Sequence, residues 1–440
     1  MLTRLDTPGE IPCAYLRDAS FPAPFKSGLL YSPPARGGWT IVHVGMLVPQ
    51  AHEIFVCAAG CLRGVVLSAA EMNLTHRFST VAIEEHNVVD GDMEELFTEG
   101  VTDILNRLPE LPPAVLVYSS CIHHFMCCDL DMCYRELRSR FPDVDFTDCY
   151  MTPTMRNGAL NPDKMMRSRL YSLLKERPAD DRFVTLVGNC FSYGDSNDIV
   201  KLVRASGREL LQITECKTYD EYQELAIGSL FITTQGVAIQ AAHELSERFG
   251  RRSVHIPVSY DPDEIRKSLS VLAQALGCEY DGGYGAEKTA LDLLDNAAKK
   301  AAGMPVAVDS LFTDRPVSLA LLLLTHGFNV DTLFVDSFSE IERTHFERLR
   351  DLAPDIMIYP TVAPGMRKFR RSPGEEYLCL GQKAAYFTES THFVDQVEDA
   401  GLYGFDGISR LADLITDAVE NPKDTRKVIS IKGMGCESCL

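Results

Sequence analysis

The chain has 440 residues, 45% of them hydrophobic, which is too long for one compact unit and predicts two or three domains. Asp and Glu number 62 against 43 Lys and Arg, giving a formal net charge of −19. So acidic a protein is not expected to bind nucleic acid or an anionic membrane surface. The longest apolar run, 318–324, is far shorter than a membrane span, and the first residues lack the apolar stretch of a secretory signal. A cytoplasmic protein is predicted.

Short β-branched runs alternate with amphipathic helical stretches along the chain. This pattern is typical of an α/β fold, and it predicts three Rossmann-like, doubly wound parallel-sheet domains around a central cleft. The predicted strands are 39–43, 79–83, 114–119, 183–187, 209–213, 229–234, 305–309, 332–336 and 355–359. The clearest predicted helices are 92–105, 236–249 and 263–276.

Polar stretches that contain proline mark the expected domain boundaries, at 177–182 and at 303–305. They predict a first αβ domain at 1–178 that carries the clustered cysteines, and Rossmann-like domains at 179–303 and 304–425. A flexible tail at 426–440 is expected to follow. Domains joined this closely favour a cofactor in the cleft between them.

The chain has 14 cysteines, which are expected to be reduced in a cytoplasmic protein. A cysteine far from any other is usually a small buried hydrophobe. This is the prediction for Cys149, Cys190, Cys216, Cys278 and Cys379.

Three cysteines stand where a cofactor is usually bound. Cys57 and Cys61 frame Ala-Ala-Gly, and Cys121 follows the apolar run 114–119 directly. Ligands of open α/β sheets gather at the carboxyl ends of the strands, and thiolates suit iron–sulfur clusters, zinc and copper(I). The spacing does not fit the paired CxxC of a zinc ribbon but fits a cluster held between two loops. The alternative is that the small residues and thiols simply pack tightly.

The stretch that begins at this third cysteine holds more possible ligands. If a helix starts near His123, then His123 with Cys127, and His124 with Cys128, are i, i+4 pairs on shared faces. They are candidates for extra ligands or for hydrogen-bond donors to a cluster. Thiols packed beneath a sheet are the alternative for these two cysteines and for Cys133.

Common nucleotide and hydrolase motifs are missing from the sequence: there is no GxxxxGK[ST], no GxGxxG after a strand, no HExxH and no GxSxG. Chemistry carried by a metallocluster is therefore expected. The chain ends in a CxxC, Cys436 and Cys439, on a Gly-rich tail. This pair would suit redox transfer or metal capture, or it has no function.

The order of these features resembles the nitrogenase component 1 family over about residues 25–420. Family members carry a CxP loop, then HGxxGC, then a strand that ends in a cysteine. Here Ser32-Pro-Pro-Ala stands at the first position, 57–61 replaces HGxxGC, and Val117-Tyr-Ser-Ser-Cys121 matches the third. The resemblance implies a cluster with altered ligation, since Ser32 removes one thiolate and Cys57 adds one where the family has His.

Three later segments are also similar to the family: 194–199, 231–238 and 403–407. Thr234 stands where the family's cofactor cysteine is expected, so a molybdenum–iron cofactor is not expected. His392 lies near the family's cofactor histidine with different spacing, and is taken as a core or loop histidine.

The resemblance implies a nitrogenase-like oxidoreductase subunit with an iron–sulfur cluster of the 4Fe–4S type. Its metal ligands are expected to be Cys57, Cys61 and Cys121, with Ser32, Cys128 and His124 as further cofactor-binding candidates. Its expected partners are a homologous subunit, in a homo- or heteromeric dimer or tetramer, and an ATP-dependent iron protein that delivers electrons for anaerobic reduction of a small molecule.

Three alternatives stay open at this point. The chain can be a scaffold on which a cluster or cofactor is matured. It can be an activator-dependent dehydratase of the 2-hydroxyacyl-CoA type, since such proteins also combine Rossmann-like units with a three-cysteine cluster. It can also be an α/β binding module that holds no metal.

Overall fold

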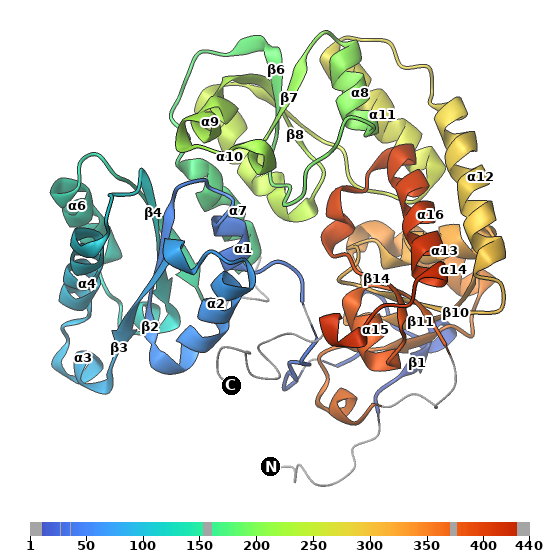
Figure 1. The fold of residues 1–440 in the computed structure, drawn as a ribbon, viewed down its shortest axis with the longest axis horizontal. Helices are drawn as coiled ribbons and strands as arrows, with labels where there is room; N and C mark the ends of the chain where they lie inside the picture. The colour runs from blue at the N-terminus through green and yellow to red at the C-terminus, as the bar shows by residue number, and fades with distance from the viewer. Residues whose placement is uncertain (1–10, 27, 36, 153–160, 370–375, 429–440) are drawn as a thin grey trace. The chain divides into compact units, whose positions relative to one another are not determined.

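The computed structural model describes residues 11–26, 28–35, 37–152, 161–369 and 376–428 (Figure 1). They divide into two compact units. The first unit is Trp39–Ser192 with Val203–Pro257. The second unit contains the described residues of Met1–Gly38, Tyr193–Leu202 and Val258–Leu440.

The first unit holds two parallel four-stranded sheets. The first sheet has the order β3-β2-β4-β5 and the second has the order β7-β6-β8-β9. The strands of the first sheet are β2 (His52–Ala58), β3 (Phe78–Ile83), β4 (Ala114–Ser120) and β5 (Asp145–Met151); those of the second are β6 (Asp180–Leu186), β7 (Glu209–Gln212), β8 (Gly228–Thr233) and β9 (Arg252–His255).

The third sheet lies in the second unit and has six strands in the order β1-β12-β11-β10-β13-β14. Its strands are β1 (Ala14–Tyr15), β10 (Pro305–Asp309), β11 (Asn329–Phe334), β12 (Met357–Tyr359), β13 (Leu378–Leu380) and β14 (His392–Val394). All pairings are parallel except that of β1 with β12. The strands therefore direct their carboxyl ends to one edge, with β1 as the exception.

Helices connect the strands, as parallel pairing requires. Those of the first unit include α1 (Ile41–Gly45), α2 (Ala59–Glu71), α3 (Glu85–Asp90), α4 (Met93–Arg107), α5 (Cys121–Phe125), α6 (Leu130–Arg140), α7 (Pro162–Ser172), α9 (Tyr219–Glu224) and α10 (Ile239–Phe249). The others are α8 (Asp198–Ala205), α11 (Pro262–Leu276), α12 (Tyr284–Lys300), α13 (Pro316–Thr325), α14 (Arg343–Leu352), α15 (Gln382–Thr388) and α16 (Gly404–Glu420).

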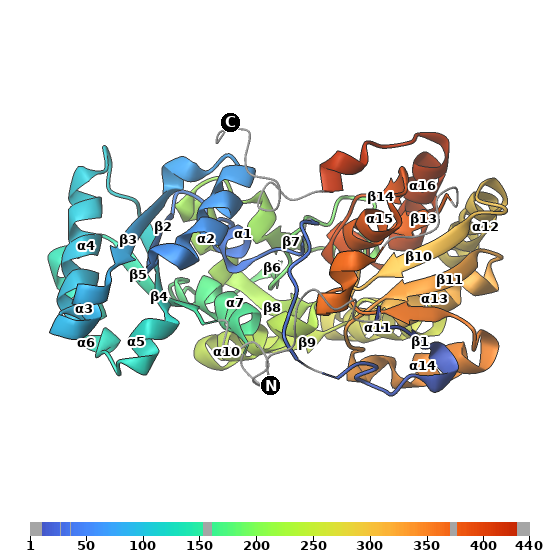
Figure 2. The ribbon, with the colours of Figure 1, turned by 90° about the horizontal axis from the view of Figure 1, so that it is seen from below.

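Alternate residues of the first sheet face two different layers of helices (Figure 2). Ile54 and Val56 of β2 belong to a core with α4 and α6. Phe55 and Cys57 belong to the other core, with α1, α2 and α7. Cys57 is therefore buried on the α2 side because of the two-residue period of the strand.

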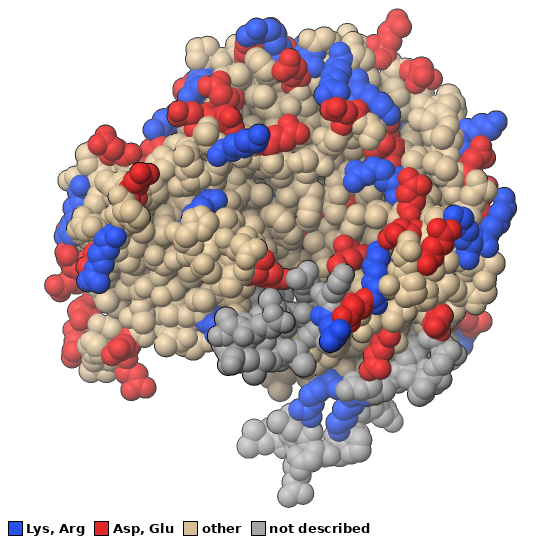
Figure 3. Space-filling view, viewed as in Figure 1, with Lys and Arg blue, Asp and Glu red and all other residues tan. Residues whose placement is uncertain are grey.

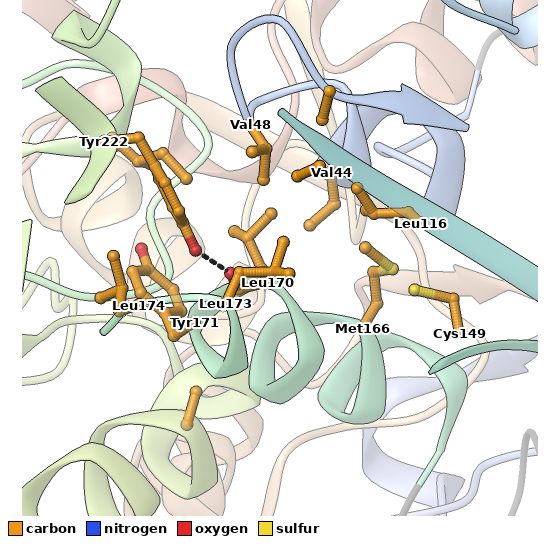
Figure 4. Packing of buried hydrophobic residues seen from close by; sticks show 14 of the residues in the cluster. Val44, Val48, Leu116, Cys149, Met166, Leu170, Tyr171, Leu173, Leu174 and Tyr222 are labelled. Carbon is orange, nitrogen blue, oxygen red and sulfur yellow. Dashed lines mark hydrogen bonds between the residues drawn. The ribbon is translucent and has the colours of Figure 1, made fainter. Parts of the chain in front are cut away.

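Helix α7 joins the first and second sheets into one unit (Figure 4). Its buried Met166 and Leu170 pack into a core that also contains Leu116 of β4 and Tyr222 of α9. The Tyr222 hydroxyl donates a hydrogen bond to the carbonyl of Leu170. The core is thus continuous behind the strand that carries Cys57.

The predicted α/β class with several parallel-sheet, Rossmann-like domains is confirmed, and the predicted strands from 79 onward correspond to β3, β4, β6, β7, β8, β10, β11 and β12. The predicted strand at 39–43 is wrong, because residues from Ile41 form α1. Thr40 caps this helix and the ring of His43 accepts the Thr40 N–H at 3.1 Å. This reciprocal capping stabilises a helix start despite the β-branched residues.

The division at residues 178 and 303 stays a prediction. The range 1–178 contributes to two sheets, since β1 pairs with β12 of the third sheet. Of the described residues, none belongs to a helix long and apolar enough to cross a membrane.

Candidate metal centre

The carboxyl ends of β2 and β4 bring the three candidate ligands to one edge of the first sheet. The two strands are neighbours, with Val56 paired to Ser119. Cys57 follows Val56 directly, and Cys121 comes two residues after Ser119 as the first residue of α5. Cys61 lies in the first turn of α2, which begins two residues after Cys57.

Cys57 is the buried member of this group, with no exposed surface. Burial, with the neighbouring thiols of Cys61 and Cys121, raises the pKa of the Cys57 thiol to about 12. The three sulfurs are thus close enough for their charges to interact. The metal-free protein keeps Cys57 protonated, and a bound cation would be needed to draw off its proton.

The other two thiols are open to solvent: Cys61 is exposed and Cys121 is half-buried. Gly60 and Gly64 lie on the same helix, and a Cβ added at either would meet no atom within 4 Å. The charged residues of α2 are only Arg63 and Glu71. On the face drawn in Figure 3, the surface over α1 and α2 accordingly carries few charges.

The short helix α5 fixes the direction of Cys121. The Nδ1 atom of His123 accepts the N–H of Ser120 at 3.1 Å, and its ring packs edge-on against Phe97. Burial lowers the pKa of His123 and keeps it neutral. His123 therefore caps the helix that carries Cys121, and its Nε2 is buried with no hydrogen-bond partner among the described residues.

The predicted i, i+4 pairs of this stretch are not formed. Helix α5 begins at Cys121 and ends at Phe125, two residues earlier than expected, and Cys127 takes a left-handed φ of 54°. Cys128 is half-buried, and burial raises the pKa of its thiol to about 11. His124 is exposed. The structure does not join these two residues into a helical ligand pair.

Most of the other cysteines that the structure describes are buried or half-buried, as expected for thiols that pack in a core. Cys133 is fully buried in the core with α4 and α6, and Cys128 packs against the same core. The isolated Cys149, Cys190 and Cys379 are buried, and Cys216 and Cys278 are half-buried.

Ser32 is exposed and belongs to the second unit. Its assignment to the cluster stays a prediction. Cys436 and Cys439 lie outside the described residues.

The donor set of this edge consists of three thiols, and thiolates are ligands of iron–sulfur clusters, zinc and copper(I). No three His, Cys, Asp or Glu side chains of the described chain converge to hold one metal ion. Thiolates of an iron–sulfur cluster bind different iron atoms, so their sulfurs stand farther apart than the ligands of one ion.

Sequence analysis missed a second polar site, at the carboxyl edge of the third sheet. The strand order reverses between β10 and β13, and this is the position where α/β sheets bind ligands. Asp309 ends β10, and its buried carboxyl accepts the N–H groups of Leu311 and Ala384, each at 2.8 Å. Gly381 has φ of 116°, and a Cβ there would lie 2.3 Å from the Asp309 carboxyl. Only glycine therefore lets α15 start so close to β10.

Neighbouring side chains extend this site. The Lys383 ammonium donates to the Thr361 hydroxyl at 2.8 Å, and Asp336 accepts the Thr361 N–H at 2.8 Å. The Gln382 amide donates to Asp395 at 2.6 Å, while its Oε1 is buried without a partner among the described residues. The signal in the sequence was an Asp at the end of each of two predicted strands, at 309 and 336.

Two of the three later segments that resemble the family, 194–199 and 403–407, meet within the second unit, whereas 231–238 belongs to the first unit. Asp198 accepts the N–H groups of Phe405 at 2.6 Å and Asp406 at 3.1 Å, and so caps α16. Thr234 is buried directly after β8. His392 starts β14, and its Nδ1 lies 2.9 Å from the Ala418 carbonyl, so it occupies the amino end of the strand as a structural residue.

Comparison with known proteins agrees with this architecture. A family model for nitrogenase component 1 type oxidoreductases matches residues 40–420. A solved structure titled "Nitrogenase Cp1 at pH 6.5" is similar with a TM-score of 0.64 and 13% identity, over 90% of this chain and 95% of that one. A second, "Nitrogenase Cp1 at pH 5", has a TM-score of 0.58 and 12% identity, over 90% of each chain. Identities this low show a shared fold only.

No curated protein matches the sequence. The family model, however, spans most of the chain, including the edge with the three thiols and every strand of the three sheets except β1. The chain therefore belongs to the nitrogenase component 1 type oxidoreductase family.

Proposed function

We propose that this nitrogenase-like oxidoreductase holds an iron–sulfur cluster of the 4Fe–4S type through Cys57, Cys61 and Cys121. The observation that carries the proposal is the placement of the three thiols after the carboxyl ends of the neighbouring strands β2 and β4. Such a cluster supplies one-electron transfer at low potential when bound.

The residues of the chain have distinct roles in this proposal. Cys57 anchors the buried side, where the stacked rings of Phe55 and Tyr118, 3.9 Å apart, exclude water. Apolar surroundings and limited hydrogen bonding to the sulfurs control the potential of a cluster. Cys61 stands on the open side.

The partners follow from the family and from this open side. The surface beside Cys61 carries few charges, which suits cover by another protein, since charged residues are depleted in the centre of interfaces. We propose a homologous subunit there, and an ATP-dependent iron protein as the electron donor.

We further propose that the small-molecule substrate engages the carboxyl edge of the third sheet. Lys383 and Gln382 offer an ammonium and an unpaired amide oxygen at the strand-order reversal. A substrate with an anionic or carbonyl group and a nearby hydrogen-bond donor would match both.

The cluster is tested on protein purified without oxygen, by iron and acid-labile sulfide analysis. We expect about four irons in the wild type and loss of iron and sulfide in Cys57→Ser, Cys61→Ser and Cys121→Ser. Cys216→Ser, after β7 in the second sheet of the same unit, is the matched control and should keep both. Folded wild-type protein free of iron and sulfide contradicts the proposal.

The maturation scaffold is kept as a second candidate because of the terminal CxxC. A scaffold would pass its cluster to an apo-acceptor, and Cys436→Ser/Cys439→Ser would slow that transfer. A reductase would keep its cluster through turnover. Acyl-CoA binding would favour the dehydratase-like alternative.

A further inference from the structure

The seven residues 395–401 that follow β14, here called the strap, cross the carboxyl edge of the third sheet. The N–H of Glu398 donates to the Leu311 carbonyl, and that of Asp399 to the Phe312 carbonyl, both at 2.7 Å. The acceptors lie in the loop after β10. Because β13 lies between β14 and β10, the strap passes over the carboxyl end of β13.

The strap holds part of the polar site beneath it. Asp395 accepts the Gln382 amide at 2.6 Å. The Oε1 atoms of Gln382 and of Gln396 are buried without a hydrogen-bond partner among the described residues. Unpaired buried acceptors are rare in folded proteins, and water would satisfy both if the strap lifted.

The backbone of the strap is strained. Glu398, Asp399 and Ala400 have φ values of 51°, 60° and 39°. Three consecutive non-glycine residues in the left-handed region store strain that the surrounding structure must hold in place. An open strap would relax all three.

The side chain of Asp399 holds the strap closed. It is 2% exposed, its Oδ1 accepts the Tyr260 hydroxyl at 2.8 Å, and its Oδ2 has no hydrogen-bond partner among the described residues. A neutral carboxyl tolerates this position, whereas a carboxylate would be a buried charge that only the hydroxyl groups of Tyr260 and Thr313 stabilise. Burial, together with the Asp314 carboxylate, raises the pKa of Asp399 to about 8.

The titratable groups that face Asp399 come from three elements. Tyr260 precedes α11, Asp314 lies in the loop after β10, and Glu398 is in the strap itself. Arg315, next to Asp314, is paired with Glu264 at 2.7 Å. The nearest charges other than this pair are negative, so they oppose ionisation of Asp399.

We propose that the strap is a proton-controlled cover over the carboxyl end of β13, closed while Asp399 carries its proton and released when that proton is lost to solvent. The cover itself stands on the geometry of the second unit; only the identity of what binds beneath it rests on the proposed function.

The direction of the pH dependence follows from linkage. When the strap is closed, the pKa of Asp399 is about 8. When the strap is open and Asp399 is exposed to solvent, its pKa returns toward the ordinary value of 3.8. The equilibrium constant for opening then rises about tenfold per pH unit between roughly pH 4 and 8, and levels off above 8.

Hydrogen exchange of the backbone at 395–403 tests the cover, after correction for the intrinsic exchange rate. From pH 6 to pH 8 we expect opening of the wild type to increase by up to about 100-fold. Asp399→Asn keeps an acceptor for Tyr260 but cannot ionise, so its opening should not change with pH. Ala400→Gly relieves one left-handed residue and should reduce opening about fivefold at both pH values with an unchanged slope.

The proposal would be overturned if opening of the strap in the wild type were constant between pH 6 and 8. It would also be overturned if opening still rose with pH in Asp399→Asn. If that variant does not fold, the wild-type series and Ala400→Gly decide alone. Iron is measured in the same samples. If the samples contain no iron but opening of the strap still rises with pH, the proposed cluster is rejected and the proposal for the strap is supported.

Discussion

The first and third sheets each have a reversal of strand order, between β2 and β4 and between β10 and β13, and their carboxyl edges differ in chemistry. The first presents Cys57, Cys61 and Cys121, which are soft sulfur ligands beside a helix with only two charged residues. The third presents Asp309, Lys383 and other oxygen and nitrogen groups that are already hydrogen-bonded. A parallel sheet thus provides the place for a ligand, and the side chains after each strand decide which ligand it takes.

The largest effect that separates the two edges is expected for Gly381→Ala. Its Cβ would lie 2.3 Å from the Asp309 carboxyl at a φ of 116°, so the start of α15 must move. We expect the second unit to lose roughly 3–5 kcal/mol of stability while the iron content is unchanged. Urea unfolding and iron analysis measure both, with Gly207→Ala, at a left-handed turn with open space, as the control. Loss of iron in Gly381→Ala would show that the edges are not independent.

The reverse test is Phe55→Ala, behind the thiol edge. Phe55 is fully buried, stacks on Tyr118 at 3.9 Å and lies two residues before Cys57. Truncation leaves a cavity and should cost about 3–5 kcal/mol in the first unit. Iron should be lost faster to a chelator, and hydrogen exchange of the strap should stay as in the wild type. An unaltered rate of iron loss would contradict the shielding role given to this ring.

The next largest effect is expected in the pH dependence of the stability of the second unit. Glu342 is buried at the start of α13, where it accepts the N–H groups of Val317 at 2.9 Å and Ser318 at 2.8 Å. Burial raises its pKa from 4.5 to about 8. The folded state then holds a proton that the unfolded state has lost. Glu342 alone should therefore lower the stability of the second unit by about 1.4 kcal/mol per pH unit between roughly pH 4.5 and 8, in addition to the contribution of Asp399, and its contribution levels off above pH 8.

Glu342→Gln keeps an acceptor for both N–H groups and should remove one proton from that slope. Thermal unfolding at several pH values measures it. A slope equal to that of the wild type would show that Glu342 is ionised in the folded protein.

The smallest effect is expected for Tyr118→Phe. The Tyr118 hydroxyl donates to the buried Glu53 carboxyl at 3.2 Å, and burial raises the pKa of Glu53. Loss of this donor should cost about 1–2 kcal/mol in the first unit, measured by urea unfolding. Iron content should not change, because the ring still stacks on Phe55.

Local sequence pattern predicted β4 and the position of Cys121 because the run 114–119 is apolar throughout and its strand is fully buried. The same reasoning missed β2, the strand that carries Cys57. His52 and Glu53 open that strand, and polar residues argue against a buried strand. Their burial depends on tertiary partners: Tyr118 for Glu53, and Ser79, 2.8 Å from the His52 ring.

The polar site at the carboxyl edge of the third sheet could not be predicted from the sequence, because it also depends on tertiary contacts. Asp309 and Gly381 are far apart in the chain, and only the pairing of β10 with β13 joins them. Strand order within a sheet is not encoded in local periodicity. The thiol edge could be predicted in outline because cysteine is an uncommon residue whose clustering is visible before the topology is known.

The most direct test of the central claim is electron paramagnetic resonance of the anaerobic, dithionite-reduced protein beside Cys121→Ser. The account predicts the signal of a reduced 4Fe–4S-type cluster in the wild type and in Cys216→Ser, and its loss or altered g-values in Cys121→Ser. A wild-type protein that is folded and reduced but silent, with no iron bound, would contradict it.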